Sequence, residues 1–485
     1  MTILDTDRWD GRLFSGGWRD ASATLKVTEP ATGEVLGQVG LASGDDVAQA
    51  VERAQTAQPE WSTAGYEQRR AVMNRAAQLI DEHHDELRDW IVRETGAVPG
   101  KGAFELHVAT NELLEAGAML SDPYGQMLPT GTPGRLSYIR RIPYGIVGSL
   151  SPWNFPLILS IRTIAPALAV GNAVIHKPSP ETPISGGFLI ARLLEEAGLP
   201  EGVLHVLPGD VETGQAIVQH PRVPMISFTG STEVGNTIAE QAAPYTKRVA
   251  LELGGNNALI VLDDADMEAA SSAGSWSTFF HQGQICMTAG RHIIHERVAD
   301  EYVERLVQRA ENLPVGDPFR EQVALGPLIN QRQLDRVSAI VDEAVVGGAD
   351  LASGGPGGGL FYKPTVLTGV STDMRAYREE VFGPVAPVVT VSDDDEAVAL
   401  ANDSEYGLTA AIQTGSMDRG LQLAERLRCA MVHINESTVD DEAHVPFGGI
   451  GASGNGARFG GKANWEEFTF SQWVTVRDRA QPFPM

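Results

Sequence analysis

Cysteine is the most reactive residue type in this chain, and it is rare, because only two cysteines occur among 485 residues. One of them, Cys286, ends the run HQGQIC at residues 281–286, where the glycine indicates a tight turn. A thiolate attacks an electrophilic carbon without needing a metal ion. A lone cysteine is also often only a small buried apolar residue. Cys286 is therefore a candidate nucleophile whose role depends on its surroundings.

Two further residues have the chemistry that thiol attack on a carbonyl carbon requires. Asn154 lies in PWNFP at residues 152–156, where prolines fix the backbone on both sides of an amide that could donate to a developing oxyanion. Glu252 lies in LELGG at residues 251–255, an apolar strand end where burial would raise its pKa towards the range of a general base. An ordinary loop asparagine and a solvated or paired acid are the alternatives.

A phosphate-binding segment is indicated by FTGSTEVG at residues 228–235. Gly230 and Ser231 follow an apolar run and precede a helical pattern, where free backbone N–H groups favour a phosphate. The segment lacks the GxGxxG spacing, so alone it is weak evidence for a nucleotide. Lys177, which follows the apolar run 173–176, could bond ribose hydroxyls, although a solvated surface lysine is the simpler interpretation.

These residues fall at the ends of short apolar runs that alternate with helical stretches. In the first series the runs are residues 146–150, 173–176, 203–207, 225–228 and 248–253. Such alternation predicts a doubly wound, mostly parallel sheet whose ligand crevice lies at the carboxyl ends of the strands. A second α/β series, with strands expected at 259–262, 292–295 and 385–391, contains Cys286.

Other segments complete the expected architecture. Apolar residues at helical spacing from about 45 to 120 predict helices, to which we assign no chemistry. The alternating segments 136–143 and 468–476 predict an arm and a terminal strand, and the latter must pair because an exposed edge strand is a liability. The composition of 354–359 predicts a flexible surface loop.

Bulk properties narrow the class of protein. The length favours two or three domains. A formal net charge of -26 would repel nucleic acid and anionic membrane surfaces. Two distant cysteines favour a reducing compartment. The N-terminus has no apolar signal region, and the most apolar window, 155–175, is interrupted by Arg162 and Pro166. We therefore expect a cytoplasmic enzyme with no metal, nucleic-acid or membrane partner.

Six motifs in order resemble the aldehyde dehydrogenase superfamily over nearly the whole chain. They are PWNFP at 152–156, FTGSTEVG at 228–235, LELGG at 251–255, GQIC at 283–286, EEVFGP at 379–384 and PFGG at 446–449. The resemblance implies two doubly wound α/β domains and a small β oligomerisation element, and therefore a homodimer or homotetramer. It places a dinucleotide-binding domain at 1–119 and 144–253, a catalytic domain at 254–450, and an oligomerisation arm at 120–143 and 468–485.

The resemblance also implies a mechanism. The Cys286 thiolate attacks the aldehyde, and Asn154 and the Cys286 N–H hold the oxyanion. Hydride then passes to a nicotinamide, and a water activated by Glu252 hydrolyses the thioester. By the same resemblance, the cofactor-binding residues are Lys177, Trp153, Gly214, Gly230, Ser231, Glu380 and Phe382.

The cofactor type is indicated by one departure from the family pattern. NAD-preferring members often carry a glutamate three residues after the lysine, and here that position is Pro180. Without that carboxylate nothing at this position repels a 2′-phosphate, so we expect NADP to be usable alongside NAD. Glu181, the next residue, weakens this expectation.

The segment 432–448 and the residues around Cys286 resemble the benzaldehyde and vanillin dehydrogenase branch, which implies an aromatic aldehyde. The expected substrate pocket contains Phe155, Ile285, Met287 and Phe447. Aliphatic aldehydes and semialdehydes are the alternative substrates.

Three other classes of protein fit the sequence less well than an aldehyde dehydrogenase. A thiol hydrolase that pairs Cys286 with His281 leaves the LELGG and EEVFGP motifs unexplained. CoA-acylating dehydrogenases usually lack the glutamate found here as Glu252, and a non-catalytic protein on this fold should have lost part of the catalytic set. Arg162 could face either the substrate funnel or an acidic neighbour.

Overall fold

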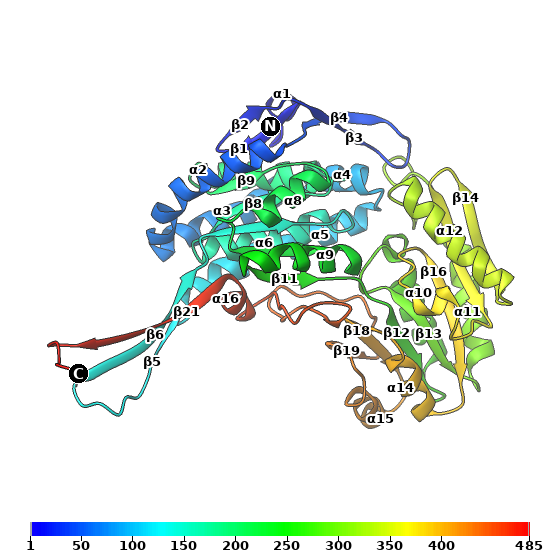
Figure 1. The fold of residues 1–485 in the computed structure, drawn as a ribbon. Helices are drawn as coiled ribbons and strands as arrows, with labels where there is room; N and C mark the ends of the chain where they lie inside the picture. The colour runs from blue at the N-terminus through cyan, green and yellow to red at the C-terminus, as the bar shows by residue number, and fades with distance from the viewer. Residues whose placement is uncertain (1, 484) are drawn as a thin grey trace.

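The computed structural model describes residues 2–483 and 485. Figure 1 shows two sheets flanked by helices, and a narrow β-arm that extends away from them. The fold is α/β with two mainly parallel sheets, as the sequence predicts.

The first sheet has the strand order β11-β10-β7-β8-β9-β1-β2. Its parallel strands are β7 (Ile146–Leu150), β8 (Ala173–Lys177), β9 (Leu204–Val206), β10 (Met225–Thr229) and β11 (Arg248–Glu252). The chain adds β8 and β9 on one side of β7 and then returns to add β10 and β11 on the other side. The strand order therefore reverses between β7 and β10, and a ligand crevice is expected at their carboxyl ends.

The N-terminal segment extends this sheet and adds a separate hairpin. Strand β1 pairs antiparallel with β9, so the sheet is mixed at this edge. The N-terminal elements are α1 (Thr6–Trp9), β1 (Arg12–Ser15), β2 (Trp18–Asp20), β3 (Thr24–Thr28) and β4 (Val35–Gly40).

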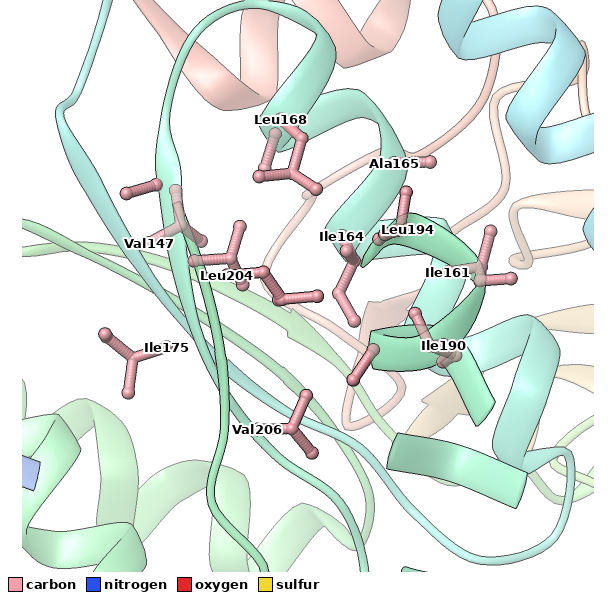
Figure 2. Packing of buried hydrophobic residues seen from close by; sticks show 14 of the residues in the cluster. Val147, Ile161, Ile164, Ala165, Leu168, Ile175, Ile190, Leu194, Leu204 and Val206 are labelled. Carbon is pink, nitrogen blue, oxygen red and sulfur yellow. The ribbon is translucent and has the colours of Figure 1, made fainter. Parts of the chain in front are cut away.

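Helices cover the first sheet, and the predicted helical region 45–120 is confirmed. They are α2 (Gly44–Thr63), α3 (Tyr66–Glu82), α4 (His84–Thr95), α5 (Pro99–Ala118), α6 (Pro156–Ala169), α7 (Leu189–Glu196), α8 (Val211–Gln219) and α9 (Thr232–Ala242). Figure 2 shows Val147, Leu204 and Val206 of the strands beside Ile164 and Ile190 of α6 and α7. The strands read as continuous apolar runs because both faces of a parallel sheet are buried.

The second sheet has the strand order β14-β15-β16-β13-β12-β18-β19. Its strands are β12 (Asn257–Val261), β13 (Ala289–His295), β14 (Asp350–Gly358), β15 (Phe361–Thr368), β16 (Val385–Val391), β18 (Thr409–Gln413) and β19 (Met431–Ile434). Its helices are α10 (Met267–Phe279), α11 (Ala299–Asn312), α12 (Gln331–Val346), α13 (Arg375–Arg378), α14 (Asp394–Asn402) and α15 (Met417–Ala424).

The predicted surface loop at 354–359 is wrong. Residues 354–358 belong to β14, an edge strand that pairs antiparallel with β15 through an irregular register. Gly355 donates its backbone N–H to Thr365 Oγ1 of β15 at 3.0 Å. The glycines of this segment lie where the strand has bulges. The segment forms a strand because β15 supplies its hydrogen-bond partners.

The arm is a three-stranded antiparallel sheet in the order β21-β6-β5. Its strands are β5 (Gly125–Met127), β6 (Arg135–Pro143) and β21 (Thr469–Arg477), which follows α16 (Ala463–Phe468). The predicted pairing of the terminal strand within the chain is confirmed, because Thr469 to Arg477 pair with Pro143 to Arg135. A short ladder of β17 (Tyr406–Gly407) with β20 (Ile450–Gly451) completes the strands described.

A buried ion pair joins α5 to the start of α6. Lys101 and Glu105 are 0% exposed and form a salt bridge one turn apart on α5. The second carboxylate oxygen of Glu105 accepts hydrogen bonds from the backbone N–H groups of Leu157 at 3.0 Å and Ile158 at 3.4 Å. These N–H groups lie in the first turn of α6, where a helix has no internal acceptors for them. Glu105 therefore fixes the position at which α6 begins.

We expect Glu105→Ala to destabilise the protein strongly, because it leaves the Lys101 ammonium buried without a counter-charge, at a cost of roughly 3–5 kcal/mol. The double variant Lys101→Met with Glu105→Gln removes both charges and should be less damaging. The thermal unfolding midpoints of both variants test this. A double variant at least as unstable as Glu105→Ala would contradict it.

Candidate active site

Cys286 lies on a left-handed turn between α10 and β13. The backbone φ angles of His281, Gln282 and Gly283 are 48°, 56° and 67°. Left-handed backbone in residues other than glycine costs of order 1–3 kcal/mol and needs support from its surroundings. Gln282 gives that support, since its Nε2 donates to the carbonyl oxygens of Gly96 at 3.0 Å and Pro327 at 2.8 Å. The predicted tight turn is confirmed.

Asn257 fixes the backbone at Cys286. Its Nδ2 donates to the carbonyl oxygens of Cys286 and Thr288, both at 2.8 Å, and its Oδ1 accepts from the Thr409 N–H at 3.1 Å. Gly255 packs against the same carbonyl, because a Cβ at this position would lie 2.3 Å from the Cys286 oxygen. Sequence reasoning missed both contributions, although Asn257 stands two residues after the LELGG motif.

The two sheets meet at Glu252 and Asn257. Glu252 is the last residue of β11, and Asn257 is the first residue of β12. The carboxyl edge of the first sheet therefore faces the amino edge of the second, where Cys286 precedes β13. The sequence predicts these residues on two different sheets, and the structure places both at this junction.

Burial controls the ionisation of the thiol and of Glu252. Burial, together with the carboxylates of Glu380 and Glu252, raises the pKa of Cys286 to about 12. Burial also raises the pKa of Glu252 well above its ordinary value. Glu252 Oε2 accepts from the Gly449 N–H at 3.2 Å, and Oε1 finds no partner among the residues described. A thiol in this setting needs a base or a nearby positive charge to ionise.

Asn154 lies beside the nucleophile turn. It is 3% exposed, follows β7, and precedes α6, which begins at Pro156. Its Nδ2 donates to the carbonyl oxygen of Gln284 at 2.9 Å. An amide nitrogen carries two hydrogens, so Asn154 retains a second one for another acceptor near Cys286.

Four of the predicted cofactor residues gather at the carboxyl edge of the first sheet. Lys177 ends β8, and a Cβ at Gly214 of α8 would lie 3.6 Å from the Lys177 side chain. Burial lowers the pKa of Lys177 to about 8, so it is not the solvated lysine of the alternative interpretation. Gly230 and Ser231 follow β10, and Ser231 caps α9. This is the crevice that the strand order predicts.

The other three predicted cofactor residues lie at the junction of the sheets. The rings of Trp153 and Phe382 contact each other edge to face, 5.4 Å between centroids. Glu380 accepts the Gly255 N–H at 2.8 Å, and burial raises its pKa to about 7. A Cβ at Gly254 would meet this carboxylate at 2.2 Å. A carboxylate accepts several hydrogen bonds, so a buried one beside glycines fits the hydroxyls of a ribose.

A cluster of apolar side chains surrounds Cys286, at the place where the sequence predicts the substrate pocket. Its buried members include the four predicted residues Phe155, Ile285, Met287 and Phe447, and also Val108, Ile158, Leu159, Leu408 and Val439, with Phe104, Phe280 and Cys286 packed against them. Aromatic contacts run inward from Trp276, which is 51% exposed. Trp276 stacks on Phe280 with centroids 4.2 Å apart, and Phe104 lies 6.4 Å from both Phe280 and Phe155.

Sequence reasoning missed the contribution of α5 to this pocket. Phe104 and Val108 lie in the helical region to which no chemistry was assigned, and they pack in the same cluster as Cys286. They stand about 180 residues before Cys286, so only the tertiary fold brings them to the thiol. No local motif marks them.

The sequence left open whether Arg162 faces the substrate funnel or an acidic neighbour, and the structure shows contacts of both kinds. Its guanidinium donates to Glu112 at 3.0 Å and to Asp441 at 2.5 Å, and it lies over the Phe447 ring at 4.6 Å. The arginine is therefore paired with acidic neighbours and supports one wall of the pocket.

His281 does not act as a base on the thiol in this arrangement. It is buried, neither ring nitrogen has a hydrogen-bond partner among the residues described, and burial lowers its pKa well below its ordinary value. Nothing in its contacts favours the thiol hydrolase. Within the described part of the chain, no group of three or more potential ligands is placed to hold a metal ion. None of the helices described is long and apolar enough to span a bilayer.

A thiol on a strained turn, a buried acid and an amide at the junction of two α/β sheets define a class of thiol-dependent enzyme. Residues 18–474 match the model of the aldehyde dehydrogenase family, and the chain belongs to that family. The resemblance seen in the six motifs is thereby confirmed.

Individual relatives are similar over their whole length. Vanillin dehydrogenase of Amycolatopsis sp. is 52% identical over 100% of both chains. The benzaldehyde dehydrogenase [NAD(+)] of Pseudomonas putida is 48% identical over 98% of both chains. Among solved structures, a salicylaldehyde dehydrogenase from Pseudomonas putida G7 complexed with salicylaldehyde has a TM-score of 0.95 at 35% identity, covering 98% of this chain and 99% of that one.

We expect Gly255→Ala to impair turnover, because its Cβ would displace the Cys286 carbonyl from Asn257. A displacement of about 1 Å at a reacting group can cost about 10²-fold in kcat. Gly100→Ala is the matched control, since a Cβ there meets nothing within 4 Å. Steady-state kinetics with an aldehyde test this, and equal kcat values for the two variants would refute it.

Proposed function

We propose that this protein oxidises aromatic aldehydes of the benzaldehyde and vanillin type to carboxylic acids, with NAD or NADP as the hydride acceptor. The observation that carries the proposal is the position of Cys286, which packs against a cluster of apolar and aromatic side chains. A planar ring gains much apolar contact against such side chains. The vanillin and benzaldehyde dehydrogenases named above support the substrate class.

Cys286 begins the reaction. Its sulfur attacks the carbonyl carbon, and the carbonyl electron pair moves to oxygen. The free hydrogen of Asn154 Nδ2 and the Cys286 backbone N–H donate to this oxyanion, and the loss of one such donor typically costs about 10²–10³ in rate. The hydrogen bond from Asn154 to Gln284 holds the amide beside the turn while it does so.

The dinucleotide, when bound, supplies a positively charged ring that accepts the hydride as the oxyanion collapses to a thioester. Lys177, Gly214, Gly230 and Ser231 would hold its adenosine and phosphate part at the carboxyl edge of the first sheet. Trp153, Glu380 and Phe382 would hold the nicotinamide end at the junction. A positive charge near the buried thiol would also lower the pKa of Cys286.

Glu252 completes the reaction. Its raised pKa makes it a base able to take a proton from water near neutral pH. The hydroxide so formed attacks the thioester carbon, the Cys286 sulfur leaves, and the carboxylic acid is released. The unpaired Oε1 of Glu252 is the oxygen available for this proton.

The pocket favours an aromatic ring over a semialdehyde that carries a carboxylate. Such a substrate needs a cation to pair with its charge. The guanidinium of Arg162, beside the pocket, is already engaged by Glu112 and Asp441. The pocket therefore provides apolar and aromatic contacts for a neutral ring.

The cofactor site is compatible with a 2′-phosphate. Pro180 lacks a carboxylate, and the carboxylate of Glu181 accepts hydrogen bonds from Ser179 Oγ at 2.6 Å and Asn330 Nδ2 at 3.2 Å. These two contacts hold the Glu181 charge in place, and that charge also acts on Lys177. The proposed use of NADP alongside NAD therefore rests on Pro180.

The arm supports assembly into a homodimer or homotetramer. Tyr124, Met127 and Trp473 of the arm are 59%, 68% and 63% exposed. Large exposed apolar side chains on one element are typical of an interface. The arm is thus the proposed oligomerisation element. A nucleophilic thiol also needs a reducing compartment to stay active, which supports the cytoplasm as the location.

A panel of aldehydes with both dinucleotides tests the proposed function. We expect NADH formation with benzaldehyde to have a higher kcat/KM than with aliphatic aldehydes or semialdehydes, and NADP to support turnover. Rapid oxidation of aliphatic aldehydes together with inactivity on benzaldehyde and vanillin would overturn it. A preference for NAD above about a thousandfold, on the order of 4 kcal/mol, would overturn the dual cofactor use.

We expect Glu252→Gln to separate the two half-reactions. Thiol attack and hydride transfer should still give a burst of NADH, while steady turnover should fall by about 10²–10⁴-fold because no base activates the water. In the wild type, kcat should rise with pH through the raised pKa of Glu252, since only its ionised form accepts a proton. Stopped-flow absorbance checks both results. Loss of the burst along with turnover would contradict this role, with Cys286→Ala as the control that abolishes both.

A further inference from the structure

A cavity of about 540 Å³ lies beside the apolar cluster that contains Cys286. Phe104 and Val108 line the cavity and also pack in this cluster, so the cluster forms part of the cavity wall. Asp441 lines the same cavity and stands on the loop between β19 and β20, which also carries Phe447 of the pocket. This loop therefore contributes both to the cavity and to the apolar cluster at Cys286.

Asp441 has an oxygen that the protein leaves unpaired. Its side chain is 8% exposed, and Oδ2 accepts from Arg162 at 2.5 Å. Oδ1 is buried and finds no hydrogen-bond partner among residues 2–483. A buried acceptor without a donor costs about 1–3 kcal/mol, and more when it carries charge. Such an atom beside a substrate pocket is ready to accept a donor from a ligand.

Arg162 holds the Asp441 carboxylate in place. One guanidinium faces two carboxylates, those of Glu112 and Asp441. The bond from Arg162 to Oδ2 fixes the carboxylate group and so fixes the position of Oδ1 as well. A charged acceptor makes a stronger hydrogen bond than a neutral one.

Asp441 is also within electrostatic reach of the reacting thiol. Its carboxylate contributes to the raised pKa of Cys286. It is joined to the pocket through Arg162, whose guanidinium lies over the Phe447 ring. An aromatic aldehyde whose carbonyl carbon is at Cys286 has its ring among these side chains and its substituents further from the thiol.

We propose that Asp441 Oδ1 accepts a hydrogen bond from a ring hydroxyl of the substrate, so that the protein prefers hydroxylated benzaldehydes. This inference rests on the proposed function and specifies its substrate class. A site built to hydrogen-bond a substrate hydroxyl rejects analogues that lack it, because its own polar group is then left unpaired. Asp441 is a specificity-determining residue, and Arg162, which bonds its other carboxylate oxygen, positions it.

Matched pairs of aldehydes test the inference. Hydroxybenzaldehydes and methylbenzaldehydes substituted at the same ring position have similar size, but only the hydroxyl is a donor. Their kcat/KM values are measured at a pH at which the ring hydroxyl is protonated. We expect the hydroxyl-to-methyl ratio for the 3- or the 4-isomer to fall by about tenfold in Asp441→Leu relative to wild type. Differences in the intrinsic reactivity of the two aldehydes cancel in this comparison.

Glu112→Leu is the matched control. It removes the other carboxylate from Arg162, and Glu112 does not line the cavity. Its hydroxyl-to-methyl ratio should stay at the wild-type value. Asp441→Asn, which keeps the shape of the side chain and removes its charge, should lower the ratio in the same direction and serves if Asp441→Leu does not fold.

The outcomes are distinct. An unchanged ratio in both Asp441 variants, or an equal fall in Glu112→Leu, would overturn the role of Asp441 while leaving the proposed function intact. Absence of turnover with every benzaldehyde in the panel would overturn the proposed function, and this inference with it.

Discussion

The short connection between the two sheets is the constraint on which the rest of the site depends. Glu252 ends β11 and Asn257 begins β12, so the carboxyl edge of the first sheet faces the amino edge of the second. The crevice of a doubly wound sheet lies at its carboxyl edge. The turn that carries Cys286 lies at this junction, and Asn257 fixes the peptide of that cysteine.

The ionisable groups at the junction are buried, and this burial changes how readily each of them ionises. Burial raises the pKa values of Cys286, Glu252 and Glu380 together, because each charged form loses solvation. A buried acid is a useful base near neutral pH, but a buried thiol is a poor nucleophile until a positive charge or a base stabilises its anion. The same desolvation thus favours the second half-reaction and ties the first to the presence of the cofactor.

The sequence predicts those parts of the site that local chain segments encode. Asn154 and Glu252 lie at strand ends that apolar runs identify, and the turn at Cys286 is marked by Gly283. Other contributions depend on distant contacts that composition does not report. Phe104 reaches the pocket from a helix, and residues 354–358 form a strand only because β15 supplies their partners.

Helix α5 shows why these distant contributions are hard to predict. Its residues Lys101, Glu105, Val108 and Glu112 are buried and recur at spacings of three or four, which is the pattern of one helix face. On a sequence such charged residues indicate solvent, because lysine and glutamate are rarely buried unless they are paired.

Here each buried charge on that face has a partner brought in by another turn or another element. Glu105 pairs with Lys101 and also holds the start of α6, next to Asn154. Glu112 meets Arg162 of α6. Burying ion pairs gives little net stability, so their placement on both sides of the pocket is better explained by the geometry they impose. The face of α5 that packs the fold is also the face that positions the start of α6 beside Asn154 and one side of the apolar cluster at Cys286.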